Sequence, residues 1–300
     1  MNRAVTDFSL TVSTSNGTFS IPRTFSSITL DGRESKVIVT DYTFGNSSKL
    51  LYSTAQVFFA GQIGTRDVLF LYGDSDQQHE FVLDLSGGEN VTSNSHFSAS
   101  GGPSGFTTIT ILGNITGLIT VFDSESQLVL YGDTDTAGTF FAPVIPSQAT
   151  DGDAATFSSY WQFGSNSTVL VGGPYLVRNA TIKGSELQLR GDLNQSAMLT
   201  VFAPPEVTSV TWNGRLVEPL SSSSKSSGGG SFTAQLQTSV STSAIIVPEL
   251  ANWKFADSLP EIQANFSDES WTIANHTTTN IPFKPYYGDG RVLYGCDYGL

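Results

Sequence analysis

Short runs of β-branched and aromatic residues recur along this chain of 300 residues, and they constrain its fold more than any other feature. Residues 35–40 (SKVIVT) and 67–72 (DVLFLY) are two such runs, with Gly or Asp turns after them. Residues 186–190 (ELQLR) alternate apolar and polar side chains, which indicates a strand with one buried face. Runs of this kind return at intervals of about ten residues, whereas helix signals are nearly absent. The pattern predicts an all-β protein.

One hairpin is marked by a two-residue turn. Asn213 and Gly214 separate the strand-like residues 211–212 from 215–216, and an Asn-Gly pair between strands is the strongest short hairpin signal. Many short strands joined by tight turns are typical of antiparallel sheets packed face to face, and not of a parallel α/β sheet. We therefore expect consecutive antiparallel β-sandwich domains.

Shifts in composition divide the chain into three zones, 1–146, 147–247 and 248–300. The first is rich in strand signals, and the small polar residues 147–153 after it favour a linker. The second contains a Ser/Gly-rich run at 221–231, which we interpret as a flexible loop because strand-like residues 232–236 follow at once. The third changes character, with Trp253, Pro260 and Trp271, and is expected to begin another domain.

The charge of the chain limits its partners. Asp and Glu outnumber Lys and Arg by 27 to 14, a formal net charge of −13. This balance argues against nucleic acid and against an anionic membrane surface, because both attract cationic proteins. No stretch approaches the roughly 18 apolar residues of a membrane span. The first residues also lack an apolar signal-peptide core, so we expect an internal piece of a longer protein.

Asparagine sequons are unusually frequent. Nine of the fourteen asparagines are followed by the x-Ser/Thr pattern of N-glycosylation, more than a Ser/Thr-rich chain gives by chance. Their number predicts an extracellular protein with glycans on exposed turns, although such a composition also produces sequons by accident. The candidate sites are Asn16, Asn46, Asn90, Asn114, Asn166, Asn179, Asn194, Asn265 and Asn275.

Cys296 is the single cysteine and cannot form a disulfide within the chain. In a secreted protein an odd cysteine favours a disulfide with a partner outside the chain. A buried free thiol is an equally good interpretation of the sequence.

Residues that could carry catalysis form no recognisable set. The histidines, His79, His96 and His276, lack metal-ligand spacing, and no serine has the glycine pattern of a nucleophile elbow. Residues 71–76 (LYGDSD) recur as 130–135 (LYGDTD), which is similar to part of a calcium loop but lacks its later ligands. A strand that leads into an acidic turn explains the same residues without a ligand, and we favour this interpretation.

Two pairs of carboxylates are candidates for the two acids of a glycosidase. Asp74 with Asp133, or Glu261 with Asp268, could pair in space, but surface turns are the better interpretation. We predict no catalytic, substrate-binding or metal-ligating residue and no cofactor.

Aromatic side chains allow a second hypothesis, a stacking platform for a sugar. In β-sandwiches most such residues belong to the core instead. The candidates are Tyr160, Trp161, Tyr175, Trp212, Trp253 and Trp271.

Blocks of sequence in a fixed order resemble one known family. The blocks at 6–8, 17–22, 28–36 and 39–42 are followed by 51–55, 68–73 and 79–81, then by 173–180, 187–193 and 210–214, and last by 253–254, 259–261, 267–271 and 293–299. Together they cover the chain nearly end to end. The chain resembles fungal secreted β-galactosidases of glycoside hydrolase family 35.

The resemblance implies the second domain, an immunoglobulin-like third domain and the start of the first jelly-roll domain for 1–146, 147–247 and 248–300. In that family a (β/α)8 barrel supplies two catalytic glutamates and the galactose contacts, and its motif has no counterpart here. The implied partners are therefore the catalytic barrel and the jelly-roll domains, with galactosides as substrates of the full-length enzyme. One departure is Asp133-Thr134-Asp135, where the family usually carries an Asp-Arg pair.

Two functions from different classes follow. The first is a non-catalytic scaffold within a secreted β-galactosidase, inactive alone. The second is a stand-alone secreted carbohydrate-binding β-sandwich, for which loss of glycan binding in Trp161→Ala or Trp212→Ala would be the supporting result.

Overall fold

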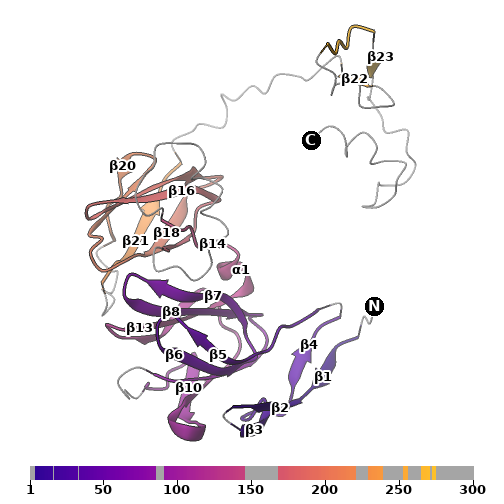
Figure 1. Cartoon of the computed structure of the whole chain (residues 1–300), viewed down its shortest axis with the longest axis vertical. Coiled ribbons are helices and arrows are strands. Elements are labelled where there is room, and N and C mark those ends of the chain that lie inside the picture. Colours follow the sequence, from indigo (N-terminus) through magenta and orange to yellow (C-terminus); the bar gives the residue numbers. More distant parts are fainter. Residues whose placement is uncertain are drawn as a thin grey trace. The chain divides into compact units, whose positions relative to one another are not determined.

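The computed structural model describes residues 4–15, 17–32, 34–85, 91–145, 168–220, 229–238, 253–255, 265–270 and 272–274. The chain divides into two compact units, Met1–Ser239 and Val240–Leu300, and each is considered by itself. Strands make up nearly all of the regular secondary structure in the described part of the chain (Figure 1), as the sequence predicts. None of its helices has the length and apolar character needed to cross a membrane.

Four sheets make up the body of the first unit, and we number them I to IV in chain order. Sheet I is fully antiparallel and has five strands: β5 (Val39–Phe44), β6 (Ser48–Ser53), β9 (His79–Leu83), β10 (Phe97–Gly101) and β11 (Thr107–Ile111), in the order β10-β11-β9-β6-β5. Sheet II has four: β7 (Gln56–Ile63), β8 (Arg66–Gly73), β12 (Leu118–Asp123) and β13 (Gln127–Asp133), in the order β12-β13-β8-β7.

Sheets III and IV follow after the short helix α1 (Thr134–Ala137). Sheet III contains β14 (Phe140–Phe141), β15 (Leu170–Gly172), β18 (Ala197–Phe202) and β21 (Ser231–Leu236), in that order across the sheet. Sheet IV contains β16 (Leu176–Lys183), β17 (Glu186–Asp192), β19 (Ser209–Trp212) and β20 (Arg215–Leu216), again in that order.

The remaining elements are small. In the first unit, β1 (Thr6–Phe8) pairs with β4 (Ile28–Leu30), β2 (Leu10–Thr14) pairs with β3 (Gly17–Ile21), and Pro103–Gly105 forms a 3-10 turn. In the second unit, β22 (Trp253–Phe255) pairs antiparallel with β23 (Thr272–Ala274).

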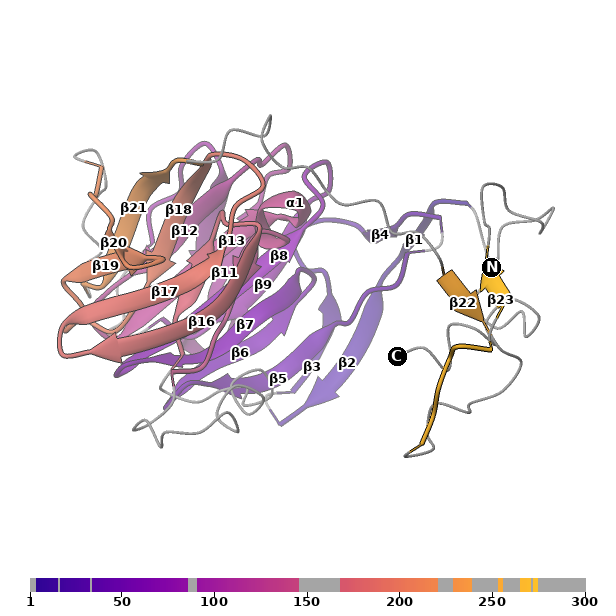
Figure 2. The same ribbon diagram turned by 90° about the horizontal axis from the view of Figure 1, so that it is seen from above.

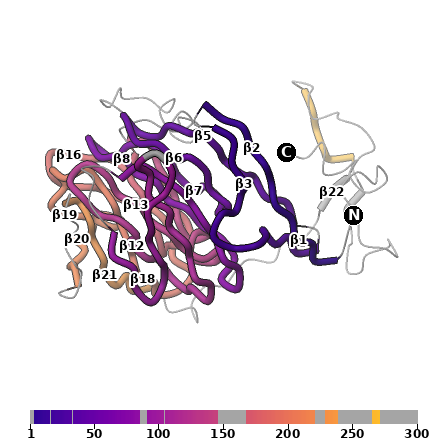
Figure 3. Tube along the Cα trace, turned by 90° about the horizontal axis from the view of Figure 1, so that it is seen from below, coloured from indigo at the N-terminus to yellow at the C-terminus, as the bar shows by residue number. Residues whose placement is uncertain are grey.

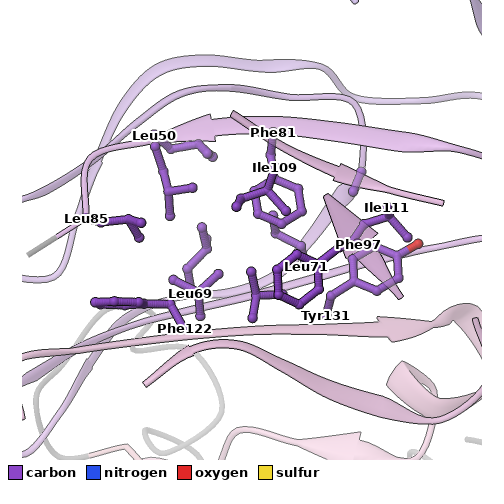
Figure 4. Close-up of a cluster of buried hydrophobic side chains, with 14 of the residues drawn as sticks. Leu50, Leu69, Leu71, Phe81, Leu85, Phe97, Ile109, Ile111, Phe122 and Tyr131 are labelled. Carbon is purple, nitrogen blue, oxygen red and sulfur yellow. The ribbon is translucent and has the colours of Figure 1, made fainter. Parts of the chain in front are cut away.

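Three apolar clusters join the four sheets into a stack (Figure 2). The first lies between sheets I and II, where Leu50 and Phe81 of one sheet face Leu69 and Leu71 of the other (Figure 4). A second joins sheets II and III, and a third joins sheets III and IV. Burial of apolar surface is the dominant favourable term in folding, so these clusters hold the layers together.

Sheet II is buried on both faces because it lies inside this stack. Along β8, Val68 and Phe70 point into the cluster shared with sheet III, whereas Leu69 and Leu71 point into the cluster shared with sheet I. Along β13, residues 128–131 alternate in the same way. A strand with two dry faces reads as a continuous apolar run, which explains the patterns at 67–72 and 128–131.

The outer face of sheet I is covered by the N-terminal ribbons. Ile21 and Ile28 pack against Leu51, Tyr52 and Val82, which point away from sheet II. Figure 3 follows the trace of the β2–β3 hairpin past β5. This end of the stack therefore has an additional apolar layer.

Two strand pairs differ from the antiparallel expectation. β13 runs parallel to β8, and β17 runs parallel to β19. The repeated Leu-Tyr-Gly-Asp segments lie on the first pair but one residue out of register, so that Tyr131 lies opposite Leu71. The two copies consequently point the same residue type to opposite faces of sheet II.

Local predictions in sheet IV are confirmed. Leu187 and Leu189 of β17 are buried, and Thr211–Trp212 and Arg215–Leu216 form the predicted hairpin. Its turn residues, Asn213 and Gly214, have φ of 50° and 79°, the positive values that a two-residue hairpin turn requires.

The strand predicted at 35–40 is wrong for its first four residues, since β5 begins at Val39. Val37 is 68% exposed, and its backbone N–H donates to Oε1 of the Gln56 side chain at 3.3 Å. The Gln56 side chain thus accepts the hydrogen bond that a neighbouring strand would accept in a sheet, and regular strand pairing begins only at Val39.

Candidate functional site

The side chains of Asp74 and Asp133 each accept hydrogen bonds at a turn. Asp133 precedes α1 and accepts hydrogen bonds from the Thr136 N–H at 3.0 Å and the Gly117 N–H at 2.5 Å. Asp74 accepts from the Thr134 hydroxyl at 2.8 Å. These are helix-capping and turn contacts. They favour the acidic-turn interpretation of both repeats. Of the other pair, Glu261 lies outside the described residues.

A cluster of three carboxylates lies beside the first acidic turn. Ligand atoms of Asp31, Glu34 and Asp74 come within 4.8 Å of one another. Lys36 lies 3.3 Å from Glu34, and the Gln77 amide donates to Asp31 at 3.3 Å and to Asp74 at 3.4 Å. Because a buried ammonium group and an amide already serve this cluster, its contacts are those of a polar junction between two loops.

His79 is a packing residue. Burial, with the charge of Lys36 as a smaller cause, lowers its pKa to about 4, so that the ring is neutral at pH 7. The ring centroid lies 6.0 Å from that of Tyr131, and a Cβ added at Gly73 would collide with the His79 ring. His96 lies in a turn, and His276 is outside the described residues.

The aromatic platform is not supported where the structure describes it. Trp212 is 7% exposed and belongs to the core between sheets III and IV, which is the interpretation that the sequence favoured for most of these aromatic residues. Its ring end packs against Gly191, where an added Cβ would touch it at 2.6 Å. Tyr175 is 64% exposed. Nothing is described for the side chains of Tyr160, Trp161, Trp253 and Trp271.

Glu80 is the most deeply buried carboxylate among the described residues, with no exposed surface. It accepts hydrogen bonds from the N–H groups of Arg23 at 2.7 Å and Thr24 at 2.8 Å, and from the hydroxyls of Thr24 and Tyr52. Burial, with the neighbouring carboxylate as a second cause, raises the pKa of Tyr52. Glu80 thereby fastens the segment after β3 to sheet I.

Asp67 fastens a second loop in the same way. Its carboxylate accepts from the N–H groups of Asn46 at 2.7 Å, Ser47 at 3.1 Å and Ser48 at 3.0 Å, which form the turn between β5 and β6. Burial alone raises the pKa of Asp67, but these bonds and one from the Ser48 hydroxyl outweigh it and leave the pKa below 3.8. Sequence patterns did not reveal either carboxylate's role, because the loop N–H groups that they hold lie 19 to 57 residues away along the chain.

The sequon asparagines that the structure describes are all exposed, namely Asn46, Asn114, Asn179, Asn194 and Asn265. Asn16, Asn90, Asn166, Asn275 and Cys296 lie outside the described residues, as do the predicted linker at 147–153 and most of the loop at 221–231. Their assignments stay predictions.

Comparison with known proteins decides the family. Residues 1–117 match the family model described as β-galactosidase, domain 2, and residues 140–228 match the model described as β-galactosidase, domain 3. The chain belongs to the β-galactosidase family. Residues 118–139, between the two β-galactosidase matches, supply β12, β13 and α1, so sheet II is completed by strands that follow the domain 2 match.

Fungal proteins are among the similar sequences. The probable β-galactosidase C of Aspergillus flavus is 35% identical over 302 residues, which cover 99% of this chain and 28% of that protein. The probable β-galactosidase B of Sclerotinia sclerotiorum is 34% identical over 297 residues, covering 98% and 27%. The probable β-galactosidase B of Penicillium rubens is 35% identical over 301 residues, covering 98% and 27%. The chain thus spans a little over a quarter of these relatives.

Proposed function

We propose that this chain is the non-catalytic middle region of a secreted β-galactosidase of glycoside hydrolase family 35. The observation that carries the proposal is the pair of successive matches to β-galactosidase domains 2 and 3. In the full-length enzyme, which would hydrolyse terminal β-D-galactosyl residues, a catalytic barrel supplies both glutamates. The present chain holds that barrel and the later jelly-roll domains in place.

The architecture supports a scaffold. The cluster between sheets II and III contains Phe70, Phe140, Leu170 and Phe202, and its aromatic rings pack with centroids 5.0 Å apart between Phe70 and Phe140. An interface of this kind resembles a domain core, which makes two sandwiches behave as one rigid piece. Rigidity is what a spacer between other domains requires.

The division into domains at 1–146, 147–247 and 248–300 belongs to the same proposal, as does an extracellular location. Exposed sequons support the location, and sheets III and IV support an immunoglobulin-like sandwich for the second range. We further propose that Cys296 pairs with a cysteine elsewhere in the full-length protein. The chain expressed alone would then show one titratable thiol.

A segment exchange tests the scaffold. The part of the Aspergillus flavus relative that matches this chain is replaced by residues 1–300, and hydrolysis of an aryl β-galactoside is measured. We expect the exchanged enzyme to be active, the enzyme without the segment to be inactive or unstable, and the chain alone to be inactive.

Matched variants separate scaffolding from chemistry. In the exchanged enzyme, Phe140→Ala should lower the temperature at which activity is lost without changing KM, while Leu216→Ala, at a side chain that is 59% exposed, should change neither. A deletion enzyme as active and as heat-stable as its parent would overturn the proposal, and so would hydrolysis by the chain alone.

A further inference from the structure

The described asparagines fall into two groups by what their side-chain amides do. Asn213 donates to the Gly191 carbonyl at 2.9 Å and accepts from the Gly191 N–H at 3.0 Å. Asn94 accepts from the N–H groups of His96 at 2.8 Å and Phe97 at 3.1 Å. Both amides therefore have structural roles, and neither asparagine lies in a sequon.

The sequon asparagines behave differently. Throughout the part of the chain that the structure describes, their side-chain amides are exposed and make no hydrogen bond; these residues are Asn46, Asn114, Asn179, Asn194 and Asn265. Attaching a sugar to such an amide breaks no contact of the fold. The structure thus distinguishes asparagines that can carry a large polar group at no cost from those that cannot.

Asn179 differs from the other four because it lies within a strand instead of a turn. It belongs to β16, an edge strand of sheet IV. Ala180 and Ile182 pack against the core, so Asn179, Thr181 and Lys183 point to the outer face. The glycan acceptor and the threonine that completes its sequon consequently lie side by side on one surface.

That surface is polar across its neighbouring strand. Asn179 lies opposite Arg190, Thr181 opposite Gln188, and Lys183 opposite Glu186. In a strand whose side chains are alternately apolar and polar, the apolar side chains face the core. The polar side chains face water. The opposite end of the stack is different, because the outer face of sheet I is covered by apolar residues of the N-terminal ribbons.

We propose that Asn179 carries an N-linked glycan that covers the outer face of sheet IV, and that this face meets solvent and not another domain of the full-length protein. In the transfer step Nδ2 of Asn179 bonds to the anomeric carbon of a lipid diphosphate-linked oligosaccharide. The bond from that carbon to the diphosphate breaks, the lipid diphosphate leaves, and the amide gives up one proton. The inference rests on the proposed secretion but not on the scaffold role.

The test uses the whole chain secreted from a eukaryotic host behind a leader peptide. Glycosidase release in heavy-oxygen water labels each asparagine that had carried a glycan, and peptide mass spectrometry then reads Asn179 and Asn194 separately. We expect label at both. Thr181→Ala should lower the mass by one glycan, whereas Thr181→Ser, which keeps the sequon, should leave it unchanged.

A second variant tests the exposure of the face. Gln188→Asn with Arg190→Thr places a new sequon on β17, with its acceptor asparagine opposite Thr181, and it should be occupied in a protein that is still secreted and folded. In the exchanged enzyme described above, the same pair of changes should leave galactosidase activity within twofold, because nothing docks on this face.

Three results would overturn the inference. Unlabelled Asn179 beside labelled Asn194 would reject the site while leaving secretion in place, and absence of label everywhere would reject both. An exchanged enzyme that loses its activity when the second sequon is occupied would show that the face is a domain interface. The wild-type measurement needs no variant, so a misfolded mutant cannot leave the question open.

Discussion

At the scale of single residues, the buried side chains of Glu80 and Asp67 accept hydrogen bonds from the backbone N–H groups of two loops. Backbone donors that would otherwise lack a partner away from water are satisfied by an acceptor from a neighbouring strand. Hydrogen bonds to a charged acceptor are stronger than neutral ones. Both loops are thus held by carboxylate oxygens that accept several hydrogen bonds each.

Replacing Glu80 by Gln should destabilise the first unit by about 2 to 4 kcal/mol. The side-chain NH2 group of Gln would face the N–H and O–H groups that now donate to the carboxylate, and several of these donors would lose their buried acceptor. Urea unfolding followed by circular dichroism measures the change. Glu125→Gln, at an exposed turn, is the control and should shift stability by less than about 0.5 kcal/mol. Equal effects of the two substitutions would contradict the role of Glu80.

Acid should loosen the turn held by Asp67. Its folded pKa lies below 3.8, so the unfolded chain binds the proton more readily and the carboxylate contributes stability at neutral pH. That contribution is complete above about pH 5 and is lost as the pH falls through about 4 toward the folded pKa. Unfolding midpoints from pH 7 to pH 2.5 should fall less steeply for Asp67→Asn than for wild type, and parallel curves would refute this.

Sequence patterns could not reveal these residues. Glu80 and Asp67 each stand at the start of an apolar run, where a charged residue indicates only a strand end or an exposed position. Their burial depends on loops from distant parts of the chain, and no spacing rule connects Glu80 to Arg23 and Thr24.

At the scale of elements, β8 and β13 show where periodicity succeeds and where it fails. A continuous apolar run predicts a buried strand but cannot say which strand lies beside it. The parallel pairing of β8 with β13 depends on the path of the chain between them, which crosses from sheet II to sheet I and back. Tight turns, by contrast, are local, and the hairpin at Asn213 and Gly214 was predictable in detail.

Phe70→Ala in β8 should cost about 3 to 5 kcal/mol of stability, because Phe70 is fully buried and its ring packs against Phe58 and Phe140. Chemical denaturation gives the value. The matched control is Leu216→Ala on the exposed strand β20, expected within about 0.5 kcal/mol of wild type. A loss below about 1 kcal/mol at Phe70 would mean that sheets II and III are not packed as described.

At the scale of the whole molecule, the sequence predicted the all-β class and the family but not the depth of the stack. The predicted boundary at 146 lies after β14, although β14 belongs to sheet III. Composition marks where a chain becomes small and polar, whereas sheet membership is decided by apolar contacts on either side of that stretch.

The four sheets of the first unit should unfold as one cooperative block. Calorimetry of the full chain should give a single transition for this unit, with calorimetric and van't Hoff enthalpies that agree. Leu170→Asp, which places a charge in the cluster between sheets II and III, should split it into two transitions. Two transitions already present in wild type would show that the sandwiches are independent.

The burial of sheet II on both faces has a consequence for isotope exchange. Amide protons of β8 and β13 are covered from above and below and are paired with strands on either side, so no local fluctuation exposes them to deuterium. They exchange only when the block opens as a whole, and their rate therefore reports its global unfolding free energy. The deuterium exchange rate of these two strands therefore measures how often all four sheets unfold together.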